Sequence, residues 1–245
     1  MSPPDSVDSP ASYPVTNVNK VKRVHDRGRY DKETIHAILD AALVCHIAYV
    51  IDGRPYCTPT GFWREGSHLY WHGSSASRMI RNQKEGVDVC LTVTHLDSLV
   101  MARSGFHHSV NYRAVMAFGK AHVIDDSEVK LKLMDRFIDR IYPGRSNLIR
   151  QPNKQEFKAT TMIGMEIETA SGKIRNTHVA DEEEDYAGVP AWSAMYPITQ
   201  VLGEPSDCPR QLPGLTRPDE MSDFEPGSRF DELMTKSYRR TFGEG

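Results

Sequence analysis

The sequence predicts an α+β protein whose core is an antiparallel β-barrel. Strand-like runs follow one another at short spacing between residues 44 and 124, and Asp52-Gly53 and Glu65-Gly66 are turn signals of the kind that join two strands into a hairpin. Only two or three helical patterns are inserted among these runs, so strands and helices do not alternate as they do in a parallel α/β sheet. A hydrophobic content of 39% is sufficient for such a core.

The first half of the chain holds one helix followed by most of the strands. Asp31 is a good N-cap, and apolar residues from Ile35 to Leu43 recur at helical spacing, so a helix is expected from Asp31. The elements expected after it are strands at Val44–Ile51, Pro55–Arg64 and His68–His72, a short helix from about Ser75 to Lys84, and strands at Val87–Leu96 and Ser109–Ile124.

Two helices and one more core strand are expected in the second half. Asp125-Asp126-Ser127 is a helix start, and Pro143-Gly144 ends the apolar face that follows it. A last core strand is expected at Thr161–Thr169. A closing amphipathic helix, capped by Ser228, is expected to run to Arg240 with basic residues at its C-terminal end.

Composition divides the chain into three parts. Residues 1–22 are rich in Pro, Ser and Asp and predict a flexible arm, and residues 23–175 form the barrel domain. Residues 176–245 predict a Pro-rich extension that packs on the barrel in irregular structure and ends in a short helix. The acidic run Asp181–Asp185 is expected to be a solvated loop.

Charge and cysteine content narrow the class of protein. A net charge of −3 gives no general attraction to nucleic acid, and no apolar run is long enough for a membrane helix. The N-terminus lacks the pattern of a secretory signal. Four widely spaced cysteines, three of them in apolar strand-like contexts, favour reduced and buried thiols, so a cytoplasmic location is expected.

The junction His72-Gly73-Ser74-Ser75-Ala76-Ser77-Arg78 leaves a strand and opens a helix. Gly73 permits close approach of the backbone, Ser74, Ser75 and Ser77 offer hydroxyls, and the Arg78 guanidinium can bind a phosphate with two hydrogen bonds. The alternative is an ordinary capped helix with a solvated arginine. The motif alone leaves both open.

The segment Cys57-Thr58-Pro59-Thr60-Gly61-Phe62 predicts an edge or bulged strand, because Pro59 cannot donate a hydrogen bond to a sheet. Its free backbone groups could bind a planar heterocycle. A bulge that turns a corner of the barrel is the structural alternative, and the two are compatible.

The third polar segment runs from Arg103 to Arg113 and contains the adjacent residues His107 and His108. Neighbouring residues of a strand point to opposite faces, so the two histidines do not form a metal site, and no metal is expected. Asn111 or Arg113 reaching a ligand is the favoured interpretation.

In this order, these segments resemble the FMN-binding split-barrel superfamily, and in particular the pyridoxamine 5′-phosphate oxidase-like proteins related to the nitroimidazole-resistance (Nim) flavoproteins. The resemblance extends over about residues 28 to 200. The matching segments are Gly53–Tyr56 with Pro59 and Phe62, Leu69–Gly73, Asn111–Val115 with Phe118–Ala121, Gly164–Glu168 with Gly172-Lys173, and Val189–Trp192 with Pro197.

The resemblance implies a six-stranded split barrel that forms a homodimer with the flavin at the subunit interface. The flavin phosphate would lie near Ser74–Arg78 and the isoalloxazine ring against the backbone of Thr58–Gly61. Arg113 would contact a second anionic group, and His72 matches a histidine beside the flavin.

The leading functional hypothesis is an FMN-dependent oxidoreductase that reduces a small nitroaromatic or quinone-like acceptor with electrons from NAD(P)H. Oxidation of pyridoxamine phosphate itself is not expected, because no basic cluster for that substrate is found. A second hypothesis is a haem protein on the same fold with His72 as the ligand. A third is a flavin-binding module without catalytic activity.

Overall fold

The structure is a computed structural model that describes residues 11–83 and 86–243. In chain order the strands are β1 (Gly28–Arg29), β2 (Val44–Ile51), β3 (Arg54–Glu65), β4 (His68–Ser74), β5 (Val87–Met101), β6 (Ser109–Val123), β7 (Thr160–Glu166), β8 (Thr169–Arg175) and β9 (Ala194–Pro197). The helices are α1 (Lys32–Asp40), α2 (Arg78–Asn82), α3 (Ser127–Ile141), α4 (Lys154–Ala159), α5 (Glu183–Gly188) and α6 (Phe230–Phe242).

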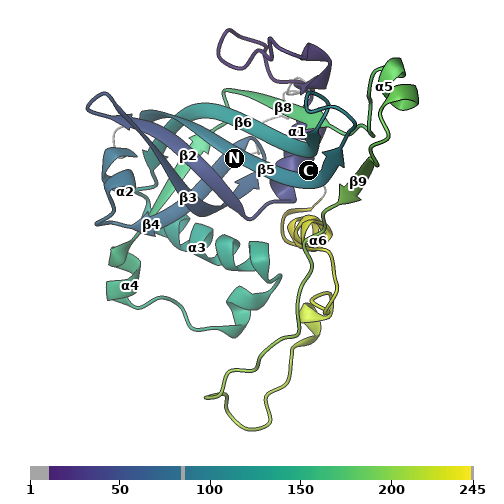
Figure 1. Cartoon of the computed structure of the whole chain (residues 1–245). Coiled ribbons are helices and arrows are strands. Elements are labelled where there is room, and N and C mark those ends of the chain that lie inside the picture. Colours follow the sequence, from purple (N-terminus) through teal and green to yellow (C-terminus); the bar gives the residue numbers. More distant parts are fainter. Residues whose placement is uncertain (1–10, 84–85, 244–245) are drawn as a thin grey trace.

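Six of the described strands close an antiparallel barrel (Figure 1). Around the ring the order is β2, β3, β4, β7, β6 and β5, and β5 pairs with β2 to complete it. Strands β8 and β1 continue the sheet from β6, and β9 continues it from β5. The prediction of an α+β, six-stranded antiparallel barrel is confirmed.

Two apolar clusters hold the barrel and its helices together. The larger fills the barrel and contains the fully buried side chains of Phe62 and Trp71. The smaller lies between the outside of the barrel and α3, where the ring centroids of Trp63 and Phe137 are 5.6 Å apart. The second cluster matters for function because it forms the floor of the site described below.

Local sequence signals gave several elements correctly. Strand β2 has the expected bounds, and its side chains alternate between buried and exposed. The Asp31 carboxylate accepts a hydrogen bond from Thr34 N–H and caps α1, and Asp126 caps α3 in the same way.

The single strand predicted at Thr161–Thr169 is two strands, β7 and β8, which meet at a sharp corner. Ile167 N–H donates to Ser67 O at 2.8 Å, and Glu168 N–H donates to Phe118 O at 3.0 Å. A side chain at Gly119 would clash with Glu166 O, so only glycine allows β6 to pass this corner. The corner is fixed by distant contacts, which explains why no local turn signal predicts it.

Other boundaries also differ from the prediction. The helix expected from Ser75 to Lys84 is the shorter α2, and the strand expected to end at Leu96 continues to Met101 past a bulge. The last helix starts at Phe230 without the expected cap from Ser228. Cys57 is exposed on β3, whereas a buried thiol was expected there.

The predicted N-terminal arm is described from residue 11 onward. Residues 1–10 lie outside the described part, but Tyr13 is buried and its hydroxyl lies 2.8 Å from Nε2 of His36. The buried Asn19 amide donates to Ala170 O at 2.8 Å. Tyr13 and Asn19 therefore attach this segment to the domain, while most of its other residues are exposed.

The extension after the barrel is anchored mainly by α6. The buried Arg140 of α3 donates to Met234 O in α6 at 2.9 Å and to Asp40 O at the end of α1 at 2.5 Å, so one guanidinium joins three helices. Residues 203–217 form an exposed loop that projects away from the barrel (Figure 1). Within the described residues, every helix is too short or too polar to cross a bilayer.

The acidic run expected as a solvated loop instead enters α5. The Asp181 carboxylate accepts hydrogen bonds from Arg103 N–H at 2.9 Å and from the Arg103 guanidinium at 3.1 Å. This pair ties the segment before α5 to the loop between β5 and β6.

Candidate functional site

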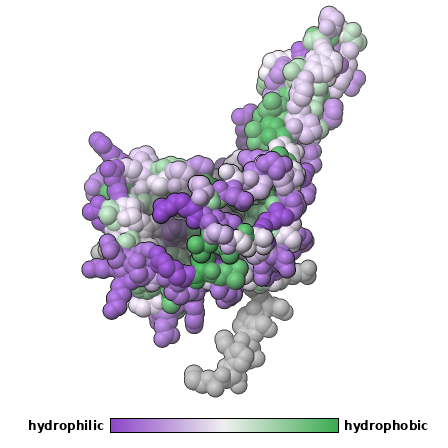
Figure 2. Space-filling model, turned by 90° about the horizontal axis from the view of Figure 1, so that it is seen from below, coloured by the Kyte–Doolittle hydropathy of each residue, from purple (hydrophilic) through white to green (hydrophobic). Residues whose placement is uncertain are grey.

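A cavity of about 450 Å³ lies outside the barrel, between β4, β7, α3 and α4. Its volume is in the range of small-molecule sites, about 300 to 1,000 Å³. Seen from below, the surface is largely hydrophilic, with apolar patches on the main body and at the base of the projecting segment (Figure 2). The cavity is lined by His72, Met134, Asp135, Phe137, Ile138, Ile149, Arg150, Pro152, Glu156, Thr160 and Met162.

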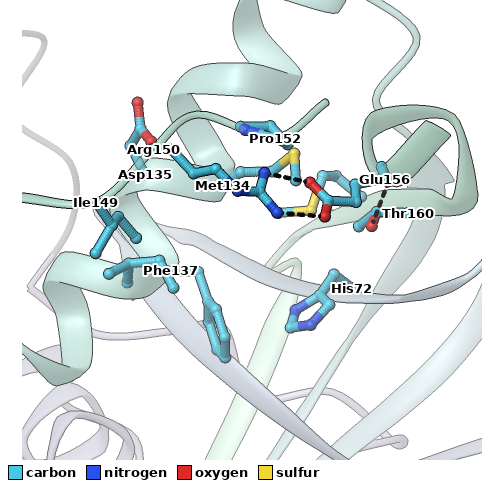
Figure 3. A pocket seen from close by; sticks show the side chains of 11 residues that line it. His72, Met134, Asp135, Phe137, Ile149, Arg150, Pro152, Glu156 and Thr160 are labelled. Carbon is cyan, nitrogen blue, oxygen red and sulfur yellow. Dashed lines mark hydrogen bonds and ion pairs between the residues drawn. The ribbon is translucent and has the colours of Figure 1, made fainter. Parts of the chain in front are cut away.

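His72 is the polar group on the floor of this cavity (Figure 3). Strand pairing sets it beside Met162 of β7, and its ring lies edge-on to Phe137 of α3 with centroids 4.5 Å apart. Its Nδ1 atom is buried and has no hydrogen-bond partner among the described residues. Burial lowers the pKa of His72, so the imidazole is neutral near pH 7.

An unpartnered buried nitrogen is unfavourable, costing about 1–3 kcal/mol. Such groups in folded proteins are rare and require an explanation, and a ligand that binds the ring is one. A neutral imidazole in an apolar cavity is suited to binding a metal ion, including the iron of a haem.

The mouth of the cavity is closed on one side by the ion pair of Arg150 with Glu156 (Figure 3). The two side chains form two hydrogen bonds of 2.7 and 2.6 Å. The hydrogen bond from Arg150, followed by that from Asn153 N–H, lowers the pKa of Glu156 to about 2. Because Glu156 also completes the capping box of α4 with Asn153, the rim is held in one geometry.

The strand predicted to meet a planar ring, Thr58–Gly61, has one free edge. Strand β3 pairs with β4 only from Phe62 onward, so in the described chain its earlier part pairs with β2 alone. Phe62 N–H donates to Leu43 O, which shows that the even-numbered residues of β3 form the hydrogen bonds to β2. Residues 55, 57, 59 and 61 therefore direct their backbone polar groups to the free edge.

Prolines occupy two of these four edge positions, 55 and 59, where an N–H would otherwise be exposed. Pro59 therefore lies in the part of β3 that, within the described residues, pairs on one side only, but β3 as a whole lies between β2 and β4 and is not an edge strand. Cys57 supplies an N–H and the edge residues supply carbonyls, which suits a ligand with both donors and acceptors. The Thr58 hydroxyl instead points to the barrel interior, 3.0 Å from the Tyr49 hydroxyl.

Gly61, at the end of this edge, lies close to the His72 cavity. A side chain at Gly61 would meet the Phe137 ring at 3.4 Å, and the same ring packs on His72. Thr60, beside Gly61, donates only a long hydrogen bond of 3.4 Å to Gly61 O. Gly61 of the predicted ring-binding strand and His72 of the cavity thus both lie against the Phe137 ring.

The predicted phosphate-binding residues cluster at the start of α2, but several already have partners. The Ser77 hydroxyl accepts from Ile80 N–H as the N-cap, and the Ser74 hydroxyl accepts from Ala76 N–H. Ser75 N–H donates to Ala159 O. A side chain at Gly73 would lie 3.0 Å from Ile80, so Gly73 allows α2 to pack on β4.

Arg78 connects this cluster to the free edge of β3. Its guanidinium lies 5.2 Å from the ring centroid of Tyr56, two residues before Thr58. Both alternatives stay compatible with the geometry: an ordinary capped helix, and a phosphate held by the exposed Arg78. Phosphate binding here stays a prediction.

Asn111 lies elsewhere, at the start of β6, and its side chain makes a complete set of hydrogen bonds. Its oxygen accepts from Arg175 at 2.5 Å and from Thr177 N–H at 3.2 Å, and its nitrogen donates to Thr177 O and to the sulfur of Met195. Arg113 is likewise engaged, by Asp97 of β5 at 2.8 Å and by Asp231 of α6 at 3.2 Å. A ligand contact for either residue stays a prediction.

Several cavity residues gave no sequence signal. Met134 and Phe137 belong to the apolar face of α3, which predicts packing and not a cavity. The helix α4 that carries Glu156 was not predicted, although Asn153 followed three residues later by Glu156 is the capping-box pattern that could have found it.

Fold and site define a closed six-stranded split barrel with a histidine-based cavity on its outer surface. Residues 31–174, more than half of the chain, match the family model described as pyridoxamine 5′-phosphate oxidase. The chain belongs to this family, which confirms the resemblance stated above. Family membership does not specify the reaction, because one fold supports many functions.

Two solved structures are similar over most of the chain. The flavocytochrome Anf3 from Azotobacter vinelandii is 40% identical with a TM-score of 0.80, and the match covers 86% of this chain and 98% of that one. The FAD and haem binding protein from Mycobacterium smegmatis is 31% identical with a TM-score of 0.77, and the match covers 83% of this chain and 99% of that one. None of the curated proteins matches the chain.

Proposed function

We propose that this chain is a flavin-dependent redox protein that also binds haem, with the haem in the cavity at His72. The observation that carries the proposal is the buried Nδ1 of a neutral histidine, which has no partner among residues 11–83 and 86–243, in a cavity with a largely apolar lining. Both similar structures support it, since one is a flavocytochrome and the other binds FAD and haem. The proposal joins the flavin and haem hypotheses, which the sequence had left as alternatives.

The residues of the cavity fit a haem. His72 would bind the iron, and Phe137, Ile138 and Met162 provide apolar surface for a macrocycle. Arg150 at the mouth provides a cation for an acidic substituent. Bound haem supplies one-electron chemistry, and the chain would keep water from it and set its polarity.

The flavin is assigned to the free edge of β3 and the start of α2. The edge donors and acceptors near Pro59 suit the polar side of an isoalloxazine ring, and Arg78 suits a phosphate. FMN is the cofactor suggested by the family resemblance, whereas FAD is the flavin of the Mycobacterium smegmatis relative. A small nitroaromatic or quinone-like acceptor and NAD(P)H as electron donor are part of the proposal.

A homodimer is also proposed, because the outward face of the sheet exposes apolar side chains on neighbouring strands. His46, Thr92 and Met116 lie in register across β2, β5 and β6, and Leu99 lies between Val110 and Tyr196. Large exposed apolar surfaces of this kind mark interaction sites. The exposed apolar residues are Val44, Val50, Leu96, Leu99, Met101, Val110, Met116 and Tyr196.

The absorption spectrum of the purified full-length protein tests the proposal. We expect flavin bands and a haem Soret band together, each titrating to a fixed ratio per chain after reconstitution. Mass spectrometry of the released flavin separates FMN from FAD. Flavin without haem would leave a flavoprotein or a flavin-binding module, and binding of neither cofactor would contradict the whole proposal. Sedimentation of the loaded protein tests the dimer.

A further inference from the structure

A second cavity, of about 540 Å³, lies where α1, the β3–β4 turn, α3 and α6 meet. It shares no lining residue with the His72 cavity. Aromatic side chains from α6 form part of its wall, and most of its polar lining comes from the other three elements. It is lined by Lys32, His36, Arg64, Glu65, Gly66, Ser67, Arg136, Tyr238, Thr241 and Phe242.

The charges that line this cavity are mainly positive. Lys32, Arg64 and Arg136 come from three different elements, and Glu65 is the one carboxylate among the described lining residues. Asp40 accepts two hydrogen bonds from Arg64, of 2.9 and 2.6 Å, and so neutralises the charge of this one cation. Glu65 is held aside in part, because it accepts a hydrogen bond from Trp63 at 2.9 Å.

Arg136 is the cation best placed to bind a ligand. It donates to Thr241 O at 3.2 Å, and its Nε lies 4.0 Å from Glu65, at the limit of an ion pair. A guanidinium has five N–H donors, so this side chain retains donors for an anion. Its side chain is 47% exposed and packs over the Phe242 ring, which fixes its position without covering it.

The positive charges around the cavity also act on His36, another lining residue. The Tyr13 hydroxyl lies 2.8 Å from Nε2 of His36, and burial raises the pKa of Tyr13 to about 12, so the hydroxyl keeps its proton at neutral pH. Burial, followed by the charges of Arg64 and Lys32, lowers the pKa of His36 to about 4. The ring is therefore neutral near pH 7 and adds an uncharged hydrogen-bonding group to the cavity lining.

We propose that this cavity binds the phosphate group of a small organic molecule, with Arg136 and Lys32 as the charged contacts and His36 as a neutral one. A planar guanidinium fork with an ammonium group is a typical combination for phosphate. The cavity is larger than a phosphate group needs, so the organic part of the ligand would occupy the space beside Phe242. Free phosphate offers the same charged group, and the experiment separates the two.

Isothermal titration calorimetry of the full-length protein with inorganic phosphate and with adenosine 5′-monophosphate tests the site. We expect saturable binding that weakens with added salt, and tighter binding of the ester than of free phosphate. Equal affinities would assign the site to free phosphate and still support a phosphate-binding cavity. Absence of binding by both probes overturns the proposal.

Two variants assign the binding to this cavity. Arg136→Gln and Lys32→Gln should each weaken binding about tenfold. Lys132→Gln, on the exposed face of α3, is the matched control and should bind as the native chain does. If all three bind equally, the phosphate binds elsewhere and the proposal is wrong.

NMR titration of His36 detects binding independently of the heat measured by calorimetry. A bound anion favours the imidazolium form, so phosphate should raise the pKa of His36 from about 4. An unchanged His36 titration at saturating phosphate would contradict binding in this cavity.

Discussion

His72 and Asn111 are polar residues on barrel strands, and the sequence associates both with a ligand, but their surroundings differ. Asn111 is 2% exposed and its amide has a protein partner for every strong hydrogen-bonding direction. His72, beside an open cavity, has a buried nitrogen that finds no hydrogen-bond partner in the part of the chain that the structure describes. The first arrangement is complete within the chain, whereas the second leaves one nitrogen without a partner among the described residues.

This difference separates structural polar residues from ligand-binding ones more sharply than residue type does. A satisfied buried network stabilises the fold, whereas an unsatisfied group lowers stability and persists where function requires it. Substitutions at the two residues should therefore have opposite consequences: loss of a cofactor at one and loss of stability at the other.

The largest effect is expected for His72→Ala. Haem uptake should be lost, because the proposed iron ligand is removed, while the free energy of unfolding of the cofactor-free protein should change by no more than about 1 kcal/mol. The Soret absorbance after reconstitution, and urea unfolding of the apoprotein, measure the two quantities. Flavin content should be retained.

His68→Ala is the matched control, because His68 lies on the same face of β4 and does not line the cavity. It should keep the haem. If His72→Ala binds haem with native affinity, His72 is not the haem ligand. The proposed difference in role between His72 and Asn111 is then wrong.

The next largest effect is expected for Asn111→Ala. The substitution leaves the buried Arg175 guanidinium and Thr177 N–H without their acceptor, so the free energy of unfolding should fall by about 2–3 kcal/mol. Denaturant unfolding of the apoprotein measures it. Asn111→Asp keeps an acceptor for Arg175 and Thr177 N–H, although it loses the donor to Thr177 O, and its free energy of unfolding should fall by less. A stable Asn111→Ala protein that no longer binds flavin would instead make Asn111 the ligand contact that the sequence predicted.

The reliable predictions from sequence were those that depend on nearby residues. Capping by Asp31 and Asp126 involves residues within three positions, and the missing N–H of Pro59 is a covalent property. The walls of the His72 cavity come from α3, α4 and β7, which follow His72 by about 60 to 90 residues. No local pattern encodes that proximity, so the sequence suggested His72 and missed Met134, Phe137 and the rim.

The same reasoning explains Arg113. The sequence shows a cation on a strand, typical of a ligand contact, but its partner Asp231 lies 118 residues further along the chain. An ion pair that uses such a distant residue becomes visible only in the folded chain. The charge was identified correctly; its partner Asp97 comes from the neighbouring strand β5, and its partner Asp231 depends on the placement of α6.

A smaller effect is expected for Asp231→Asn. Both partners of this ion pair are partly exposed, so the loss of stability at pH 7 should be about 1 kcal/mol or less. Burial alone would raise the pKa of Asp231, but hydrogen bonds from Arg229 and Arg113 hold it below its ordinary value. A carboxyl whose pKa is lowered by folding stabilises the protein above its ordinary pKa, and this contribution disappears as the pH falls through the folded-state value.

The difference in unfolding free energy between the native chain and Asp231→Asn should therefore shrink between pH 7 and pH 3. Glu232→Gln, at the adjacent exposed position, is the control and should show a smaller difference at pH 7. A difference for Asp231→Asn that stays constant with pH would mean that Asp231 does not stabilise the fold through Arg113, and would leave Asp97 as the partner of Arg113.

The smallest effect is expected at the rim, for Arg150→Gln. Its ion pair with Glu156 is exposed, so unfolding should be unchanged, but loss of the cation at the mouth should speed haem dissociation several-fold if the rim retains the cofactor. Without the Arg150 hydrogen bonds, the pKa of Glu156 should rise from about 2 toward its ordinary value, which NMR titration can follow. Lys154→Gln on α4 does not alter the pair and serves as the control. Unchanged haem dissociation together with the raised Glu156 pKa would restrict the role of the pair to capping α4, and retention of the cofactor would then depend on His72 and the apolar walls alone.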